Sequence, residues 1–167
     1  MSLEHLADDA NVVVAGASGG IGAEFVRQLS ASSQIGRVFA LYRKPPATAP
    51  AGVENLACDL SDEESIVSAA ALIAEHGPVD AVIVASGIQH RGDIQPEKSL
   101  RSIDAESMLE VFRINTIGPV LLAKHFLPLL RRDSRTLFAA LSARVGSIAD
   151  NRLGGWASYR ASKAALN

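Results

Sequence analysis

Two residues near the end of the chain, Tyr159 and Lys163, have the spacing of a proton-transferring pair. In a helix, residues four positions apart lie one turn apart on the same face. A phenol has an ordinary pKa of about 10, which is too high for efficient proton transfer near neutral pH. A neighbouring ammonium favours the phenolate and lowers that pKa. The pair therefore predicts a general acid/base, the alternative being an exposed helix pair without a chemical role.

A glycine-rich turn near the start of the chain is typical of a phosphate site. The β-branched run at residues 12–14 predicts a buried strand, and a helical pattern opens at Ile21. Glycine lets the backbone take positive φ and approach a diphosphate closely, and a helix N-terminus presents free N–H groups to the anion. The residues expected around the anion are Gly16, Ser18, Gly19, Gly20, Ile21 and Gly22. The alternative is a strand–helix turn without a ligand.

The composition fits one globular domain over residues 1–167, with 48% hydrophobic and 20% charged residues. A formal net charge of -2 argues against nucleic-acid and membrane partners, because no basic field attracts phosphate-rich surfaces. The one cysteine, Cys58, cannot form an internal disulfide, and the histidines show no metal-ligand spacing, so no metal site is expected. We find no signal peptide or membrane-length apolar run, and a cytoplasmic location is expected.

The elements that must position these residues alternate along the chain. Strands are predicted at residues 12–14, 37–41, 53–57, 81–85 and 136–141. The first helix is predicted to begin at Ile21, and a second follows a capping box of Ser61 and Glu64. A long third helix is predicted from Asp104 to about Arg132, with Arg131 and Arg132 against its dipole. A fourth helix is predicted from Tyr159 onward. Strands that are apolar on both faces and alternate with helices indicate an α/β fold: a doubly wound parallel sheet in a Rossmann-type three-layer αβα sandwich.

Ligands of such sheets bind beyond the carboxyl ends of the strands. This rule places residues 15–22, 41–44, 58–60, 85–90 and those from 142 onward around one crevice. His90 is predicted at the mouth of the crevice, and Leu153 and Trp156 are candidates for lining a substrate site or for core packing.

The order of these motifs resembles the short-chain dehydrogenase/reductase family along the whole chain. The matching residues are Gly16, Gly20 and Gly22 in G-x-x-x-G-x-G, Asp59-Leu60, Asn115 with Gly118-Pro119, and Tyr159 with Lys163. Residues 87–90, 142–147 and 159–167 are similar to a branch of small members related to the myxobacterial C-factor. The resemblance implies hydride transfer between a nicotinamide cofactor and a small-molecule carbonyl or alcohol substrate.

The resemblance also implies a role for each matching residue. Tyr159 would exchange the proton with the substrate oxygen, Lys163 would lower the tyrosine pKa and bind the nicotinamide ribose, and Asn115 would bend its helix and hold a water. Asp59 would bind the adenine, with Leu60, Ala85, Ser86 and Gly87 also beside the cofactor. For Asn115 the alternative is an ordinary helix asparagine, and for Asp59 a solvated turn carboxylate.

Cofactor choice depends on the end of the second predicted strand, where NAD requires a carboxylate and a 2′-phosphate requires a cation. The sequence there is Tyr42-Arg43-Lys44. A guanidinium binds phosphate through paired hydrogen bonds. We therefore predict NADP rather than NAD, with Arg43 on the phosphate and Lys44 assisting, the alternative being a solvated basic loop.

Three departures from the family pattern affect the site. Ala15 replaces the usual threonine before the glycine turn, and residues 84–87 keep only the glycine of the usual asparagine-rich segment. The family's catalytic serine lies three residues before a glycine, and counting back from Gly146 gives Ala143. Ser142 is assigned this role, with Ser147 as the alternative.

The chain ends at Asn167, shortly after Lys163, where family members continue into a further strand and a substrate-covering lobe. We expect a piece of a longer protein whose sheet is incomplete at the C-terminal end, the alternative being a partner that covers the sheet edge. A homodimer or homotetramer is expected from the resemblance. The expected function is NADP-dependent oxidoreduction, and the alternative is a catalytically weak or inactive nucleotide-binding signalling protein on the same fold.

Overall fold

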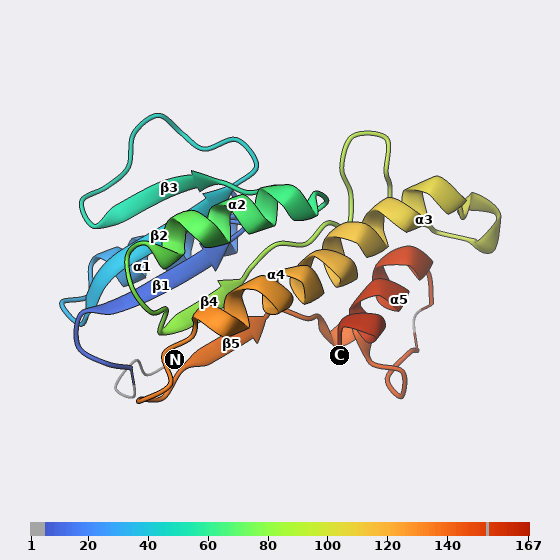
Figure 1. The fold of residues 1–167 in the computed structure, drawn as a ribbon. Helices are drawn as coiled ribbons and strands as arrows, with labels where there is room; N and C mark the ends of the chain where they lie inside the picture. Colours follow the sequence, from blue (N-terminus) through green and yellow to red (C-terminus); the bar gives the residue numbers. More distant parts are fainter. Residues whose placement is uncertain (1–5, 153) are drawn as a thin grey trace.

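The structure is a computed structural model that describes residues 6–152 and 154–167. Five parallel strands form one open sheet in the order β3-β2-β1-β4-β5 (Figure 1). The strands are β1 (Ala10–Ala15), β2 (Ile35–Tyr42), β3 (Val53–Ala57), β4 (Ala81–Val84) and β5 (Leu137–Ala140). The winding reverses between β1 and β4, so a crevice opens beyond the carboxyl ends of these two strands. The predicted doubly wound parallel sheet is confirmed.

Helices cover both faces of the sheet. They are α1 (Gly20–Ser30), α2 (Glu63–Ala74), α3 (Ala105–Phe112), α4 (Gly118–Phe126) and α5 (Ala157–Leu166), with short 3-10 turns at Leu100–Ser102, Leu127–Leu129 and Arg144–Gly146. α1 lies on one face, α2 and α4 lie on the other, and α3 packs against α5 beyond the carboxyl end of the sheet (Figure 1).

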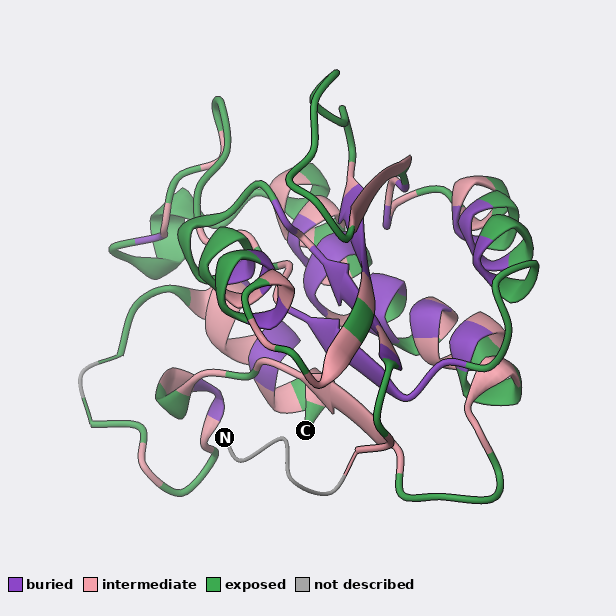
Figure 2. Ribbon diagram, turned by 90° about the vertical axis from the view of Figure 1, so that its left-hand side faces the viewer, coloured by how far each residue is buried: buried purple, intermediate pink, exposed green. Residues whose placement is uncertain are grey.

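The central strands are buried on both faces, as Figure 2 shows. Successive side chains of a strand point to opposite sides. Val13 therefore packs toward α2 and α4 with Phe39 and Phe126, whereas Val12 packs toward α1 with Val26. This double burial explains why the strands have continuous apolar sequences rather than alternating ones.

The single long helix predicted from Asp104 to about Arg132 is not found. Asp104 caps α3 as expected, but a π-helical segment (Arg113–Ile117) separates α3 from α4. Pro119 has no N–H to donate to the carbonyl of Asn115, and the N–H of Gly118 bonds instead to Arg113 five residues earlier. The register therefore changes at Asn115, where the resemblance implied a bend.

Two further helix boundaries differ from the prediction by one or two residues. The N-cap of α2 is Asp62 and not Ser61, because the Asp62 carboxylate accepts a 3.0 Å bond from the N–H of Glu64. The N–H and hydroxyl of Ser61 are instead both donated to Asp59, at 2.9 and 2.7 Å. The last helix begins at Ala157, so Tyr159 lies within its first turn.

A polar cluster holds the amino ends of the strands together. Asp80 is fully buried, and its carboxylate accepts bonds from Arg131 Nε at 2.6 Å and from the N–H of Asn11 at 2.9 Å. Arg131 does not lie against a helix dipole as the sequence predicts, because α4 ends at Phe126 and the chain turns before Arg131. The guanidinium neutralises a buried carboxylate instead.

Among the helices that the structure describes, none has both the length and the apolar character needed to cross a lipid bilayer.

Candidate active site

The glycine turn between β1 and α1 is shaped by close backbone approaches. Gly16 has a φ of +86°, and a Cβ there would lie 2.7 Å from the N–H nitrogen of Ser86. A Cβ on Gly22 would lie 2.8 Å from the carbonyl carbon of Gly16. No side chain caps the N-terminus of α1, which starts after Gly19. The turn thus leaves helix N–H groups available to an anion and leaves room for no side chain of its own.

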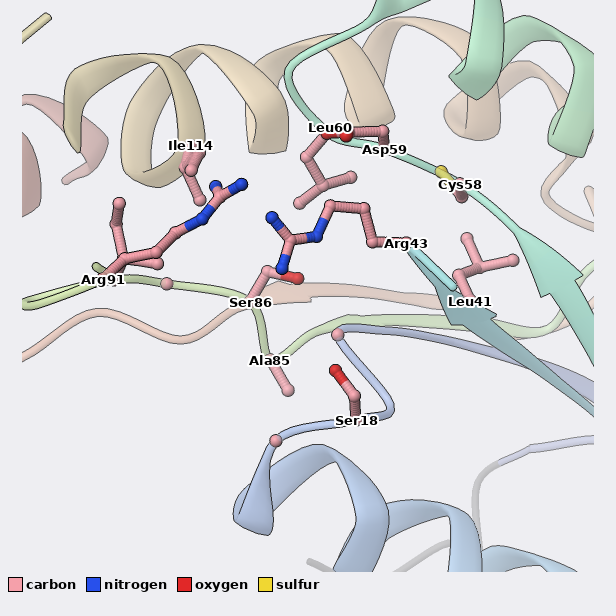
Figure 3. A pocket seen from close by; sticks show the side chains of 14 residues that line it. Ser18, Leu41, Arg43, Cys58, Asp59, Leu60, Ala85, Ser86, Arg91 and Ile114 are labelled. Atoms are coloured by element: carbon pink, nitrogen blue, oxygen red, sulfur yellow. The ribbon is translucent and has the colours of Figure 1, made fainter. Parts of the chain in front are cut away.

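Most of the predicted cofactor residues line one pocket beyond the strand ends (Figure 3). These are Gly16, Ser18, Gly19, Arg43, Asp59, Leu60, Ala85, Ser86 and Gly87. The structure brings them together from four separate segments of the chain. Gly20, Ile21 and Gly22 belong to the first turn of α1 and are not part of the pocket lining, and the Ile21 side chain is exposed. Lys44 is exposed and does not line the pocket.

Arg43 gives the β2 side of this pocket a positive charge near the carboxylate of Asp59. Figure 3 shows its guanidinium extending into the pocket from the end of β2. Burial raises the pKa of Asp59, but the hydrogen bonds from Ser61 and the charge of Arg43 outweigh burial, so the pKa is lowered. Asp59 is therefore an ionised acceptor at neutral pH, although one of its oxygens is already bonded to Ser61.

Lys163 connects the Tyr159 helix to this pocket. Its ammonium donates a 2.8 Å bond to the carbonyl of Leu141, at the end of β5, and the residue is buried. A Cβ on Gly87 would lie 3.2 Å from Lys163 Nζ and 3.5 Å from Asn115 Oδ1. Since Gly87 follows the Ser86 that abuts Gly16, the loop after β4 approaches both the glycine turn and the Lys163 ammonium.

Asn115 is fully buried and makes three side-chain hydrogen bonds. Its Oδ1 accepts from the N–H of Ile88 at 2.7 Å, and its Nδ2 donates to the carbonyl of Ile88 at 2.8 Å and to Ser162 Oγ at 3.0 Å. The neighbouring Thr116 hydroxyl donates to the carbonyl of Ser162 at 2.8 Å. The π-helical segment therefore joins the loop after β4 to α5, so Asn115 is not an ordinary exposed helix asparagine.

The pKa of Tyr159 shifts opposite to the sequence prediction. Tyr159 is half-buried, and burial raises its pKa above the ordinary value, while burial lowers the pKa of Lys163. The ammonium lies 6.0 Å from the centroid of the phenol ring, and its hydrogen bond goes to Leu141. At this distance the desolvation of the phenol outweighs the attraction of the ammonium for a phenolate.

The two candidate serines lie in different environments. Ser142 follows β5 and is exposed, whereas the Ser147 hydroxyl accepts a 3.1 Å bond from the N–H of Asp150 and so stabilises a turn. Ala143, at the position where the family has serine, precedes the 3-10 turn at Arg144–Gly146. Among the described residues no hydrogen-bond partner of the Ser142 hydroxyl is found, whereas the Ser147 hydroxyl has one.

The pocket is also lined by Leu41, Cys58 and Ile88, which lie in the segments predicted around the crevice. It is further lined by Arg91 and Ile114, which lie outside those segments. Arg91 extends into the pocket opposite Arg43 (Figure 3) and pairs with Glu110 of α3 at 3.3 Å. Only its place after the fourth predicted strand could have indicated it. Ile114 could not have been found, because it enters the pocket through the change of helical register. His90 and Trp156 are exposed and outside the pocket lining, and Leu153 lies outside the described residues.

Within residues 6–152 and 154–167, no group of three or more histidine, cysteine, aspartate or glutamate side chains could hold a metal ion. A dinucleotide does fit the residues present. The glycines that line the pocket, Gly16, Gly19 and Gly87, put no side chain into it, and Arg43 supplies a cation. These features suit the crevice of this doubly wound sheet to a dinucleotide.

Comparison with known proteins assigns the family. The short chain dehydrogenase family model matches residues 10–167, and the chain belongs to this family. It is 31% identical over 157 residues to 1-hydroxy-2-glutathionyl-2-methyl-3-butene dehydrogenase of Rhodococcus sp. (strain AD45). The aligned region covers 93% of the chain and 66% of that dehydrogenase. The chain is 37% identical over 91 residues to C-signal of Myxococcus xanthus, covering 54% of the chain and 52% of that protein.

Among solved structures, the NADPH-bound carbonyl reductase from chicken fatty liver superposes with a TM-score of 0.83 at 29% identity. This similarity covers 97% of the chain and 68% of the reductase. The carbonyl reductase Sniffer of Caenorhabditis elegans superposes with a TM-score of 0.82 at 25% identity, over 95% of the chain and 76% of that protein. The chain spans about half to two thirds of the length of the curated relatives named above.

Proposed function

We propose that the protein is an NADP-dependent oxidoreductase that moves hydride between nicotinamide and a carbonyl or alcohol substrate. The observation that carries the proposal is that the loop at Ser86 and Gly87 approaches both Gly16 and Lys163. The glycine turn abuts the loop after β4, and that loop abuts the lysine ammonium. A dinucleotide on the turn would thus extend toward the helix that carries Tyr159.

The bound nicotinamide nucleotide would supply or accept the hydride. Tyr159 would give a proton to the carbonyl oxygen, or take one from the alcohol, as the general acid/base. Lys163, whose ammonium lies at the Gly87 end of the pocket, would hold the nicotinamide ribose. Asn115 would fix the loop at Ile88, and the exposed Ser142 hydroxyl would bind the substrate oxygen.

Arg43 supports NADP over NAD. It lines the pocket at the end of β2, where no carboxylate is present to bind ribose hydroxyls. The guanidinium would pair with the 2′-phosphate, and Asp59, Leu60, Ala85 and Ser86 would surround the adenosine half. The NADPH bound by the similar reductase from chicken fatty liver agrees with this choice.

The names of two relatives support the substrate class. One is a dehydrogenase of a hydroxy compound and the other a carbonyl reductase. The family resemblance also supports a homodimer or homotetramer. Exposed apolar side chains agree with it: Leu109 on α3 is 58% exposed, Val120 on α4 is 59% exposed, and Ile117, in the segment between the two helices, is 49% exposed. Sedimentation of the purified chain tests the oligomeric state.

A second function is a nucleotide-binding signalling protein with little or no turnover. Two observations favour it: the similarity to C-signal, and Ala143 in the place of the family's serine. Such a protein would bind NADPH through the same pocket without oxidising it.

The test is NADPH oxidation with a panel of aldehydes, ketones and quinones, comparing the wild-type chain with Tyr159→Phe. Turnover that Tyr159→Phe lowers by roughly 100-fold or more supports the enzyme. NADPH binding without turnover on any substrate supports the signalling protein. Turnover that is equal in both chains would exclude the proposed role of Tyr159.

A further inference from the structure

Glu97 makes three hydrogen bonds to the start of the Tyr159 helix. Its carbonyl accepts from the N–H of Trp156 at 2.7 Å. One carboxylate oxygen accepts from the N–H of Ser158 at 3.3 Å, and the same oxygen accepts a short bond from the Ser158 hydroxyl. Glu97 and Ser158 are 7% and 3% exposed. A residue 61 positions away in the sequence thus contacts the residue directly before Tyr159.

α5 lacks a cap of its own, and this explains the place of Glu97. The N-cap residue is Trp156, whose backbone is left-handed with φ of 53° and ψ of 43°. The Trp156 side chain accepts no hydrogen bond from the helix. The first N–H groups of a helix need such acceptors, and a carboxylate at the N-terminus also interacts favourably with the helix dipole. Glu97 serves as the missing cap.

Tyr159 and Lys163 are held by different contacts, although they share a helix. Lys163 lies one turn further along and is anchored by the carbonyl of Leu141 at 2.8 Å. Tyr159 is in the first turn, and no hydrogen bond of its phenol is found in the described residues. The position of the phenol therefore depends on the order of the first turn. Glu97 contributes its bonds to that turn, beside those of Arg160 to the carbonyls of Gly155 and Val145.

We propose that Glu97 is a positioning residue that fixes the Tyr159 phenol relative to Lys163 and the pocket, through its bonds to Trp156 and Ser158. The expected change in NADPH oxidation rests on the proposed function, whereas the expected change in the titration of the Tyr159 phenol does not. Glu97 does not line the pocket that contains Arg43, so its effect on Tyr159 would pass through the helix.

The test uses Glu97→Ala and Glu97→Gln in a Tyr42→Phe background. The chain has two tyrosines, so the remaining phenolate absorbance reports Tyr159 alone. Asp104→Ala is the matched control, because the Asp104 carboxylate likewise caps a helix, accepting a 2.8 Å bond from the N–H of Ser107 in α3, and no hydrogen bond joins Asp104 to α5 within the described residues. All four chains are titrated below the pH at which circular dichroism shows unfolding.

We expect Glu97→Ala to move the Tyr159 titration down toward an ordinary tyrosine, because a loosened first turn exposes the buried phenol. Glu97→Gln keeps the accepting oxygen and should titrate close to the unchanged chain. On NADPH oxidation, kcat of Glu97→Ala should fall roughly 10- to 100-fold with little change in the KM for NADPH. Asp104→Ala should match the parent chain in both measurements.

The proposal would be overturned if the shift of the Tyr159 titration in Glu97→Ala is no larger than the shift in Asp104→Ala. If the wild-type chain oxidises no NADPH, the proposed function fails, but the titration still decides the role of Glu97. If Glu97→Ala does not fold, Ser158→Ala replaces it: loss of the hydroxyl bond should shift the titration in the same direction by a smaller amount, and an unchanged titration would count against Glu97.

Discussion

Asn115 and Ser162, 47 residues apart, share a 3.0 Å hydrogen bond between two side chains that are both fully buried. The Ser162 hydroxyl in turn donates to the carbonyl of Tyr159 at 2.8 Å. The change of helical register at Asn115 is therefore connected to the helix of the predicted catalytic tyrosine by an unbroken series of hydrogen bonds.

Asn115→Ala should destabilise the protein by about 2–4 kcal/mol, because it leaves the N–H and carbonyl of Ile88 and the Ser162 hydroxyl without their buried partner. Urea unfolding followed by circular dichroism measures the change. Asn151→Ala is the control, since Asn151 is exposed and its substitution should stay within about 0.5 kcal/mol of wild type. Equal losses for the two variants would contradict the buried network.

Arg43→Ala should reduce the preference for NADP over NAD by roughly 10- to 100-fold, since a charge-assisted bond to the 2′-phosphate is lost while the rest of the pocket remains. The dissociation constants of both nucleotides, measured by calorimetry, give the ratio. Arg132→Ala removes the same charge from an exposed site outside the pocket and should leave the ratio unchanged. A wild-type chain that binds both nucleotides equally would refute the prediction of NADP.

Arg131→Ala should lower Tm by roughly 5–15 °C, because the fully buried Asp80 carboxyl group would lose the guanidinium that pairs with it. The exposed pair of Arg27 and Glu24 provides the comparison, and Arg27→Ala should change Tm by less than about 2 °C. Thermal unfolding of the two variants side by side checks the difference. Similar shifts would mean that the Asp80 cluster contributes no more than a surface pair.

Cys58 should react slowly with iodoacetamide in the folded chain. Burial, followed by the charges of Asp59 and Asp62, raises the pKa of its thiol to about 12. At pH 8 the thiolate fraction should be roughly 1000-fold below that of an ordinary cysteine. The same chain unfolded in denaturant is the control, and folded and unfolded chains reacting at one rate would disprove the shift.

The same thiol carries a pH dependence of stability. Its folded pKa of about 12 lies above the ordinary value of 9.0, so its contribution is unchanged below about pH 9 and is lost as the pH rises toward 12. Cys58→Ala should remove this part of the alkaline destabilisation in unfolding measurements at increasing pH.

The strands and the glycine turn could be predicted from the sequence because their signals are local. The run at residues 12–14 followed by Gly16 is sufficient to place a buried strand and a phosphate turn. The predicted fold class and family are confirmed by the sheet order and by the family match. The roles of Arg43, Asp59 and the serines remain predictions.

The remaining features depend on contacts between distant segments. Glu97 has no local pattern that indicates a cap for a helix 61 positions later. The π-helical segment was missed, although Pro119 was visible, because a proline alone does not specify a register change rather than a helix end. The pKa of Tyr159 could not be predicted, since it depends on burial and on the direction of the Lys163 ammonium.

The polar cluster at Asp80 has a consequence for the opposite end of the molecule. Strands that are apolar on both faces could slide past one another by a residue and still bury valine against valine, so hydrophobicity alone aligns them poorly. The bonds that Asn11 makes to Asp80 and to the carbonyl of Pro78 at 3.1 Å fix β1 against β4. Because Gly16 and Ser86 follow those same two strands, the alignment chosen at the amino end decides whether the two residues meet where the cofactor is expected to bind.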